Sequence, residues 1–167
     1  MKRRQFIALM GGGIILAAGS GAAAFVSTRE PGKALAPWRR AGSAYDDLRK
    51  RALSFAILAP NPHNRQPWLV DLAIENQVTL YVDTGKLLPH TDPLNRQITV
   101  GLGCFLEVMS MAAAEQGVRA DIQLFPQGSD ASGLTKAPVA TATFVTNATA
   151  KPDPLFAHVL QRRTLKE

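Results

Sequence analysis

The stretch of sequence that decides the fold spans residues 97–116 and reads QITVGLGCFLEVMSMAAAEQ. Its apolar side chains are spread almost all round a helical wheel, which is the pattern of a helix buried on most of its sides. Gly117 follows at the position where a helix C-cap belongs. We therefore predict a central buried helix on which the rest of the domain is built.

Shorter elements flank this helix in the sequence. Apolar residues recur at helical spacing from Tyr45 to Ala59, and Pro60 ends that pattern. Apolar and β-branched runs predict strands over residues 69–74, 78–82, 120–125 and 139–145, and residues 154–162 predict a last helix. The predicted order, αββαββα, indicates an α+β fold with a mixed or antiparallel sheet around the central helix.

Length and charge limit the classes of function. A chain of 167 residues fits one domain with an appendage. The net charge is +6, but Lys2, Arg3 and Arg4 carry half of it, which leaves only +3 for the rest of the chain. Because no basic and aromatic stripe accompanies this small excess, we expect no binding to nucleic acid.

Cysteine, histidine and glycine give little support to other kinds of site. Cys104 is the single cysteine, so it forms no intramolecular disulfide, and its apolar neighbours predict a buried, unreactive thiol. The three histidines lack the spacing of metal ligands, so we predict no metal site. Gly101-Leu102-Gly103 lacks the third glycine and the preceding strand of a phosphate loop, and it predicts close helix packing instead.

The first 26 residues have the features of an export signal. Residues 2–7, Lys-Arg-Arg-Gln-Phe-Ile, resemble the twin-arginine motif, and no charged side chain follows until Arg29. The weakly apolar, glycine-containing core favours export through the twin-arginine machinery to the periplasm. Residues 6–26 are also long enough to anchor the chain in the inner membrane if the signal is not cleaved. Residues 27–44, without periodicity, predict a linker.

The loop after the first predicted helix carries the polar residues of most interest. Residues 59–68 read APNPHNRQPW, and their three prolines exclude a helix and reduce the freedom of the loop. Asn64 and Gln66 supply two carboxamides, each of which both donates and accepts hydrogen bonds. Such a pair suits the edge of a flat heterocycle with alternating N–H and C=O groups. An ordinary proline-rich turn would have a similar composition.

This loop resembles the A-P-S-x-x-N-x-Q-P-W segment of the nitroreductase family, with Asn61 where the family has Ser. Further residues resemble the Acg-type branch, whose members look like two nitroreductase halves fused in one chain: Asp92-Pro93, Arg96, Gly101, Cys104 and Arg162-Arg163-Thr164. The similarity covers residues 37–167.

The resemblance implies an FMN-dependent oxidoreductase that moves hydride from NADH or NADPH to a nitroaromatic or quinone-like acceptor. It implies that Asn61, Asn64 and Gln66 bind the flavin, with Asn64 at the ring edge and Gln66 as a second contact or a brace. It also implies that Arg162, Arg163 and Thr164 reach the flavin and its phosphate, which guanidinium groups bind through paired hydrogen bonds. We identify no catalytic acid, base or nucleophile, because the cofactor would do the chemistry.

In the fused branch the arginine segment opens the second half. We therefore expect residues 45–167 to form the N-terminal half of a nitroreductase-like domain, whose site is completed by a second half or by a second copy of the chain. Two alternatives stay open: a non-catalytic protein that sequesters FMN, and an inactive, truncated envelope protein.

Overall fold

The computed structural model describes residues 20–29, 32–43, 45–130, 133–146 and 150–163. The chain divides into two compact units, Met1–Ala36 and Pro37–Glu167. In the first unit, residues 20–28 are helical, and the twin-arginine motif at residues 2–7 lies outside the described residues. The second unit contains the sheet and the central helix.

Among the described residues, four strands form one antiparallel sheet in the order β1-β2-β4-β3. The strands are β1 (Trp68–Asp71), β2 (Gln77–Val82), β3 (Arg119–Leu124) and β4 (Ala140–Val145). In the register of the two central strands, Leu80 of β2 lies opposite Ala140 of β4. Alternate side chains of β4 are buried, which is the pattern of a sheet covered on one face, whereas β2 also buries the consecutive residues Val78, Thr79 and Leu80.

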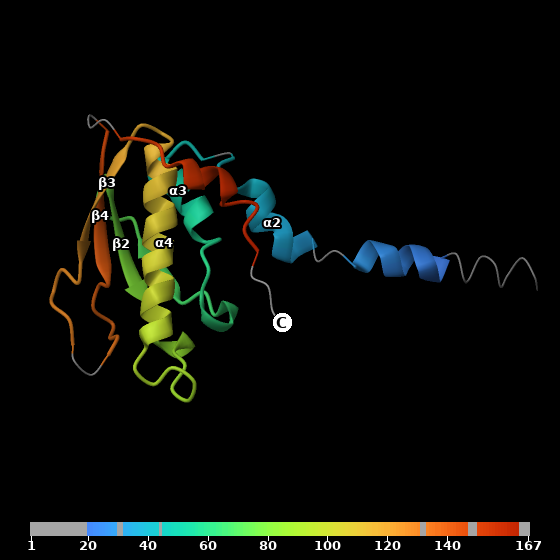
Figure 1. Cartoon of the computed structure of the whole chain (residues 1–167), viewed down its shortest axis with the longest axis horizontal. Coiled ribbons are helices and arrows are strands. Elements are labelled where there is room, and N and C mark those ends of the chain that lie inside the picture. Colours follow the sequence, from blue (N-terminus) through green and yellow to red (C-terminus); the bar gives the residue numbers. More distant parts are fainter. Residues whose placement is uncertain (1–19, 30–31, 44, 131–132, 147–149, 164–167) are drawn as a thin grey trace, which may run out of the picture. The chain divides into compact units, whose positions relative to one another are not determined.

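Helix α4 (Arg96–Ala114) supplies the core of the second unit. Its side chains Ile98, Phe105 and Met109 are fully buried and join Leu80 and Ala140 of the sheet in one hydrophobic cluster. Figure 1 shows α4 alongside the strands, with α3 (Leu48–Ala56) on its other flank. The predicted α+β fold and the central helix are confirmed, and the sheet is antiparallel.

The length and apolar composition of α4 would also suit a membrane span. Core helices of globular domains meet the same criterion, and part of α4 is buried inside the unit. The helix is therefore weak evidence for membrane insertion.

Two predicted segments differ from the structure. The expected linker contains the helix α2 (Gly32–Arg40). Ala34, Leu35 and Ala36 favour a helical conformation, and the helix continues through Pro37. The expected last helix at residues 154–162 is instead the short 3-10 helix η3 (Pro154–His158), which is followed by turns. The segment contains no fully buried residue, and Phe156 attaches it to the core through an edge-to-face contact with Phe55.

An ion pair fixes the start of α3 against the turn between β1 and β2. The Asp47 carboxylate caps α3 by accepting from the Arg49 backbone N–H at 2.8 Å, and it also pairs with the Arg49 guanidinium at 2.8 Å. Nη1 of Arg49 donates to the carbonyls of Leu72, Ile74 and Gln77. The side-chain hydrogen bond from Arg49 holds the pKa of Asp47 below its ordinary value.

The pH dependence of Asp47 variants tests this ion pair. Asp47→Asn keeps a capping side chain but loses the charge, so we expect it to reduce the free energy of unfolding at pH 7 by about 0.5–1 kcal/mol. Asp47→Ala also loses the cap and should cost about 1–2 kcal/mol. Because the folded pKa is lowered, the charge stabilises the fold above the unfolded pKa, and its contribution is lost as the pH falls through the folded value.

The measurement is urea unfolding of the unmodified chain and both variants at pH 7 and near pH 3. The difference between the unmodified chain and Asp47→Asn should shrink at the lower pH. A difference that stays constant or grows would show that the carboxylate charge does not act in this way.

Candidate functional site

The loop between α3 and β1 has an unusual backbone. It forms the short 3-10 turn η1 (Pro62–Asn64), and His63, Asn64 and Gln66 have φ angles of 49°, 51° and 49°. This left-handed region is uncommon for residues other than glycine, and Asn accepts it more readily than Gln or His. Such conformations persist where the surroundings hold them, and they concentrate at binding sites.

Asn61 closes this loop from within. Its Oδ1 accepts from the backbone N–H of Gln66 at 2.7 Å, and its Nδ2 donates to the carbonyl of Ala59 at 3.2 Å. Both ends of the carboxamide are therefore engaged by the backbone. Asn61 therefore stabilises the loop from within, and its predicted contact with flavin stays a prediction.

Asn64 and Gln66 keep hydrogen-bonding capacity for a ligand. Both side chains are exposed, and Nε2 of Gln66 donates to Oδ1 of Asn64 over 3.4 Å, a long hydrogen bond. Within the described part of the chain, neither Nδ2 of Asn64 nor Oε1 of Gln66 has a hydrogen-bond partner. The pair therefore presents one donor and one acceptor to a binding partner.

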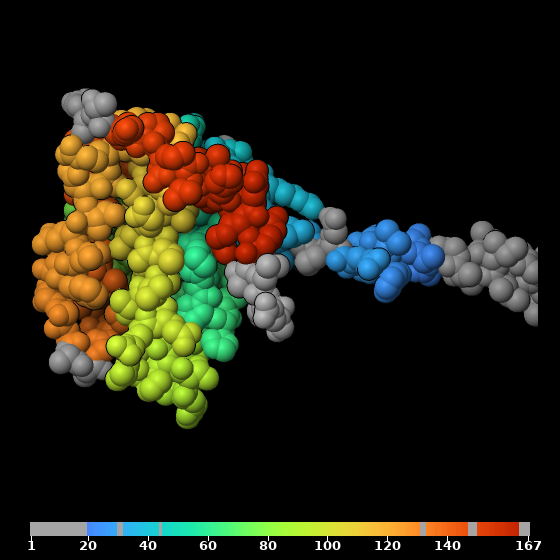
Figure 2. All heavy atoms as spheres, viewed as in Figure 1, coloured from blue at the N-terminus to red at the C-terminus, as the bar shows by residue number. Residues whose placement is uncertain are grey.

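An open groove of about 470 Å³ lies between this loop and α4. It is lined by Pro60, Asn61 and Pro62 of the loop and by Arg96, Gln97, Val100, Gly101 and Cys104 of α4. Its wall is mostly apolar, and Val100 is 67% exposed. In Figure 2, the outer face of α4 reaches the surface between α3 and the segment that carries β3 and β4. Asn64 and Gln66 belong to the same loop but do not line the groove.

The loop can approach α4 closely because residue 101 is glycine. A Cβ at Gly101 would lie 3.2 Å from Cδ of Pro62 and 3.3 Å from Cβ of Asn61, whereas a Cβ at Gly103 would meet nothing within 4 Å. Close packing, as predicted for the glycine pair, therefore concerns Gly101 and not Gly103. Three residues that suggested the family, Arg96, Gly101 and Cys104, meet at this groove.

The thiol of Cys104 is not fully buried, so the expectation of a buried cysteine is wrong. Cys104 is half-buried and lines the groove, one turn after Val100 on the outward face of α4. Its neighbours Phe105 and Leu106 point into the core, which is why the local sequence suggested burial. No group of His, Cys, Asp and Glu that could hold a metal ion occurs among the described residues.

The arginine segment contacts the backbone near the loop. Nη2 of Arg162 donates to the carbonyl of Leu58 at 2.7 Å. Nη1 of Arg163 donates to the carbonyls of Leu160 and Arg162, and its guanidinium lies 6.0 Å from the ring centroid of Trp38. Thr164 lies outside the described residues. Neither arginine lines the groove, and their predicted contacts with a phosphate stay a prediction.

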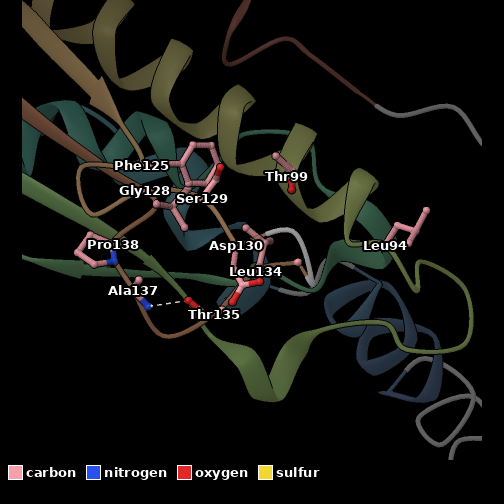
Figure 3. A pocket seen from close by; sticks show the side chains of 12 residues that line it. Leu94, Thr99, Phe125, Gly128, Ser129, Asp130, Leu134, Thr135, Ala137 and Pro138 are labelled. Atoms are coloured by element: carbon pink, nitrogen blue, oxygen red, sulfur yellow. Dashed lines mark hydrogen bonds between the residues drawn. The ribbon is translucent and has the colours of Figure 1, made fainter.

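A second cavity of about 230 Å³ lies under the connection between β3 and β4 (Figure 3). Two of its hydroxyl groups serve local structure: Oγ1 of Thr135 accepts from the Ala137 N–H, and Oγ1 of Thr99 donates to the Asn95 carbonyl. It contains none of the predicted site residues. We therefore place the candidate site at the groove beside the loop.

Gln97 and Val100 also line the groove, and sequence reasoning did not select them. Their spacing of three residues to each other, and of four from Val100 to Cys104, puts them on one face of α4. This spacing did not single out the groove-lining face, because α4 is apolar on nearly every side.

Two mycobacterial proteins are similar to this chain in sequence. The first is a Mycobacterium tuberculosis protein provisionally named as the NAD(P)H nitroreductase acg, which is 34% identical over 100 residues that cover 60% of this chain and 30% of the relative. The second, the uncharacterised protein Rv3127, is 32% identical over 120 residues, 69% of this chain and 33% of the relative. The matched part of the chain spans about a third of the length of these relatives. No family model matches the sequence.

Two solved structures resemble the chain more remotely. One is a Clostridium acetobutylicum protein provisionally named as an NADH oxidase, with a TM-score of 0.49 and 15% identity over 74% of this chain and 90% of that one. The other is a nitroreductase family protein from Streptococcus pneumoniae, with a TM-score of 0.45 and 16% identity over 66% and 84%. The similarity to the acg protein supports a relationship between this chain and the nitroreductase family.

Alanine at the two glycines of α4 tests the close approach of the loop. Gly103→Ala should raise the free energy of unfolding by about 0.5–1 kcal/mol, because alanine favours helix and meets open space. Gly101→Ala gains the same preference but presses on Pro62 and Asn61, so we expect it to be less stable than Gly103→Ala by about 1 kcal/mol or more. Urea unfolding measures both. Equal stabilisation by the two substitutions would contradict the close packing.

Proposed function

We propose that this chain supplies the loop-bearing lobe of an FMN-dependent oxidoreductase of the nitroreductase type. The single observation that carries the proposal is a left-handed loop that leaves a carboxamide donor and acceptor exposed next to an apolar groove. The sequence similarity to a protein provisionally named as an NAD(P)H nitroreductase supports the same conclusion.

The residues present fit a flavin ring. An isoalloxazine has an apolar end and a polar edge of alternating N–H and C=O groups. In the proposal, Nδ2 of Asn64 donates to this edge and Oε1 of Gln66 accepts from it, while the groove around Val100 receives apolar surface. When bound, FMN supplies the transfer of hydride between a nicotinamide and an acceptor.

The role of this chain is to bind and orient the ring and to exclude water from one side of it. The described residues offer exposed carboxamides and apolar surface for this task. We assign the substrates as NADH or NADPH and a nitroaromatic or quinone-like acceptor, following the family resemblance.

A second lobe completes the site in this proposal. Val100 and Leu94, near the start of α4, are 67% and 70% exposed, which leaves apolar surface that a neighbouring lobe would cover. The lobe is either a further part of a longer chain or a second copy of this one. Arg162, Arg163 and Thr164 then bind the flavin phosphate where the two lobes meet.

Export to the periplasm belongs to the same proposal. The twin-arginine motif at residues 2–7 supports it, and retention in the inner membrane is the outcome if the signal is not cleaved. The twin-arginine route carries folded proteins, which suits a flavoprotein that binds its cofactor before transport.

Isosteric substitutions test the proposed contacts. Asn64→Asp and Gln66→Glu keep the size of each side chain, and aspartate tolerates the left-handed backbone. Asn64→Asp removes the donor Nδ2 that the proposal assigns to the ring edge and adds a negative charge. Gln66→Glu keeps an acceptor oxygen, loses the hydrogen bond from Nε2 to Oδ1 of Asn64 and adds a second negative charge. We expect the unmodified chain to quench flavin fluorescence with a Kd of roughly 10 μM to 1 mM, since one lobe makes only part of the contacts. The double variant should weaken binding by about tenfold or more.

Gln127→Glu is the matched control, because Gln127 is exposed and lies outside the groove. It should leave the affinity unchanged. Nanomolar binding by the single chain would contradict the need for a second lobe, and the absence of saturable quenching up to millimolar FMN would contradict the flavin assignment. With a second lobe present, bound FMN without consumption of NADH or NADPH would favour sequestration over catalysis.

A further inference from the structure

A short turn far along the chain packs against the carboxamide loop. This turn, η2 (Thr84–Lys86), follows β2 and reaches the loop through reciprocal hydrogen bonds. Nζ of Lys86 donates to the carbonyl of Gln66 at 3.1 Å. In return, Nε of Arg65 donates to the carbonyl of Lys86 at 3.1 Å, and Nη2 of Arg65 donates to that of Gly85 at 3.4 Å.

The turn is itself held in place. Oδ1 of Asp83 caps it by accepting from the Gly85 N–H at 3.1 Å, and Oδ2 of Asp83 lies 3.7 Å from Nζ of Lys86. The Asp83 N–H donates to the carbonyl of Pro67 at 2.6 Å, which joins the turn to the residue after Gln66. The position of Lys86 is therefore set by the Asp83 carboxylate and by the backbone hydrogen bond between Asp83 and Pro67.

These hydrogen bonds hold Gln66 in a strained backbone conformation. Gln66 has a φ of 49°, a left-handed conformation that is unfavourable for a residue with a Cβ. Its N–H is bound by Oδ1 of Asn61, and its carbonyl is bound by Lys86. With both backbone groups engaged, the peptide plane on each side of Gln66 has a defined orientation, and so has the direction in which its side chain leaves the loop.

We infer that Lys86 and Arg65 are positioning residues, which hold the carboxamides of Asn64 and Gln66 in the orientation that receives a ligand. The effect of this role on ligand binding rests on the proposed function, because the ligand is the flavin assigned above. Loss of the ammonium group frees the Gln66 carbonyl, and the strained residue then relaxes toward ordinary backbone conformations.

Variants of Lys86 and Arg65 in the full chain test this positioning role, which we call the brace. Lys86→Met keeps the aliphatic stem and removes the donor, whereas Lys86→Arg keeps a donor of similar reach. Arg65→Met removes the reciprocal bonds. Lys151→Met is the control, since Lys151 is exposed and has no hydrogen bond or ion pair with the described residues.

The first readout needs no flavin. Amide hydrogen exchange, followed by NMR, should become about five- to tenfold faster at Gln66 in Lys86→Met, as expected when one hydrogen bond that protects a local structure is lost. Exchange in α4 should stay unchanged, because the core is not touched. Lys86→Arg should restore slow exchange at Gln66, and Lys151→Met should have no effect.

The second readout is the Kd for FMN, which Lys86→Met should raise by about three- to tenfold and Lys86→Arg should largely restore. Unchanged exchange at Gln66 in Lys86→Met, or equal effects of Lys151→Met, would overturn the brace. The two proposals fail in distinguishable ways. If exchange responds but the unmodified chain binds no FMN, the flavin assignment is wrong while the brace stands; if FMN binds and exchange does not respond, the brace is wrong.

Discussion

The close approach between Gly101 of α4 and the loop at Asn61 and Pro62 is the contact on which the site depends. Helix α4 is fixed by its own burial against the sheet, so it acts as a rigid wall. Because the loop packs directly on Gly101, its position is set by the buried helix. The groove beside Val100 follows from the same arrangement, because the loop covers only part of the outer face of α4.

The loop combines strain with many backbone contacts. Left-handed residues would relax in an isolated peptide, yet here Asn61 closes the loop from inside and Lys86 holds it from outside. Prolines on both sides reduce the number of unfolded conformations that compete. The result is a pair of carboxamides whose placement is set before a ligand arrives, which lowers the entropic cost of binding.

The sequence predicted the elements whose signals are periodic. The burial of α4 and the four strands follow from hydrophobic patterns, and the loop followed from its prolines and carboxamides. What the sequence could not predict are contacts between distant residues that carry no local pattern. Nζ of Lys86 binds a carbonyl 20 residues away, and Arg162 binds one 104 residues away. Cys104 was misjudged because its neighbours in sequence point inward while it faces the groove.

Chemical-shift mapping during an FMN titration tests the central claim most directly. The account predicts that saturable shifts concentrate at the backbone amides of Asn64 and Gln66 and along the groove at Val100, Gly101 and Cys104. It also predicts little change in the connection between β3 and β4, where the second cavity lies. Saturable shifts confined to that connection, with the loop unaffected, would contradict the assignment of the site.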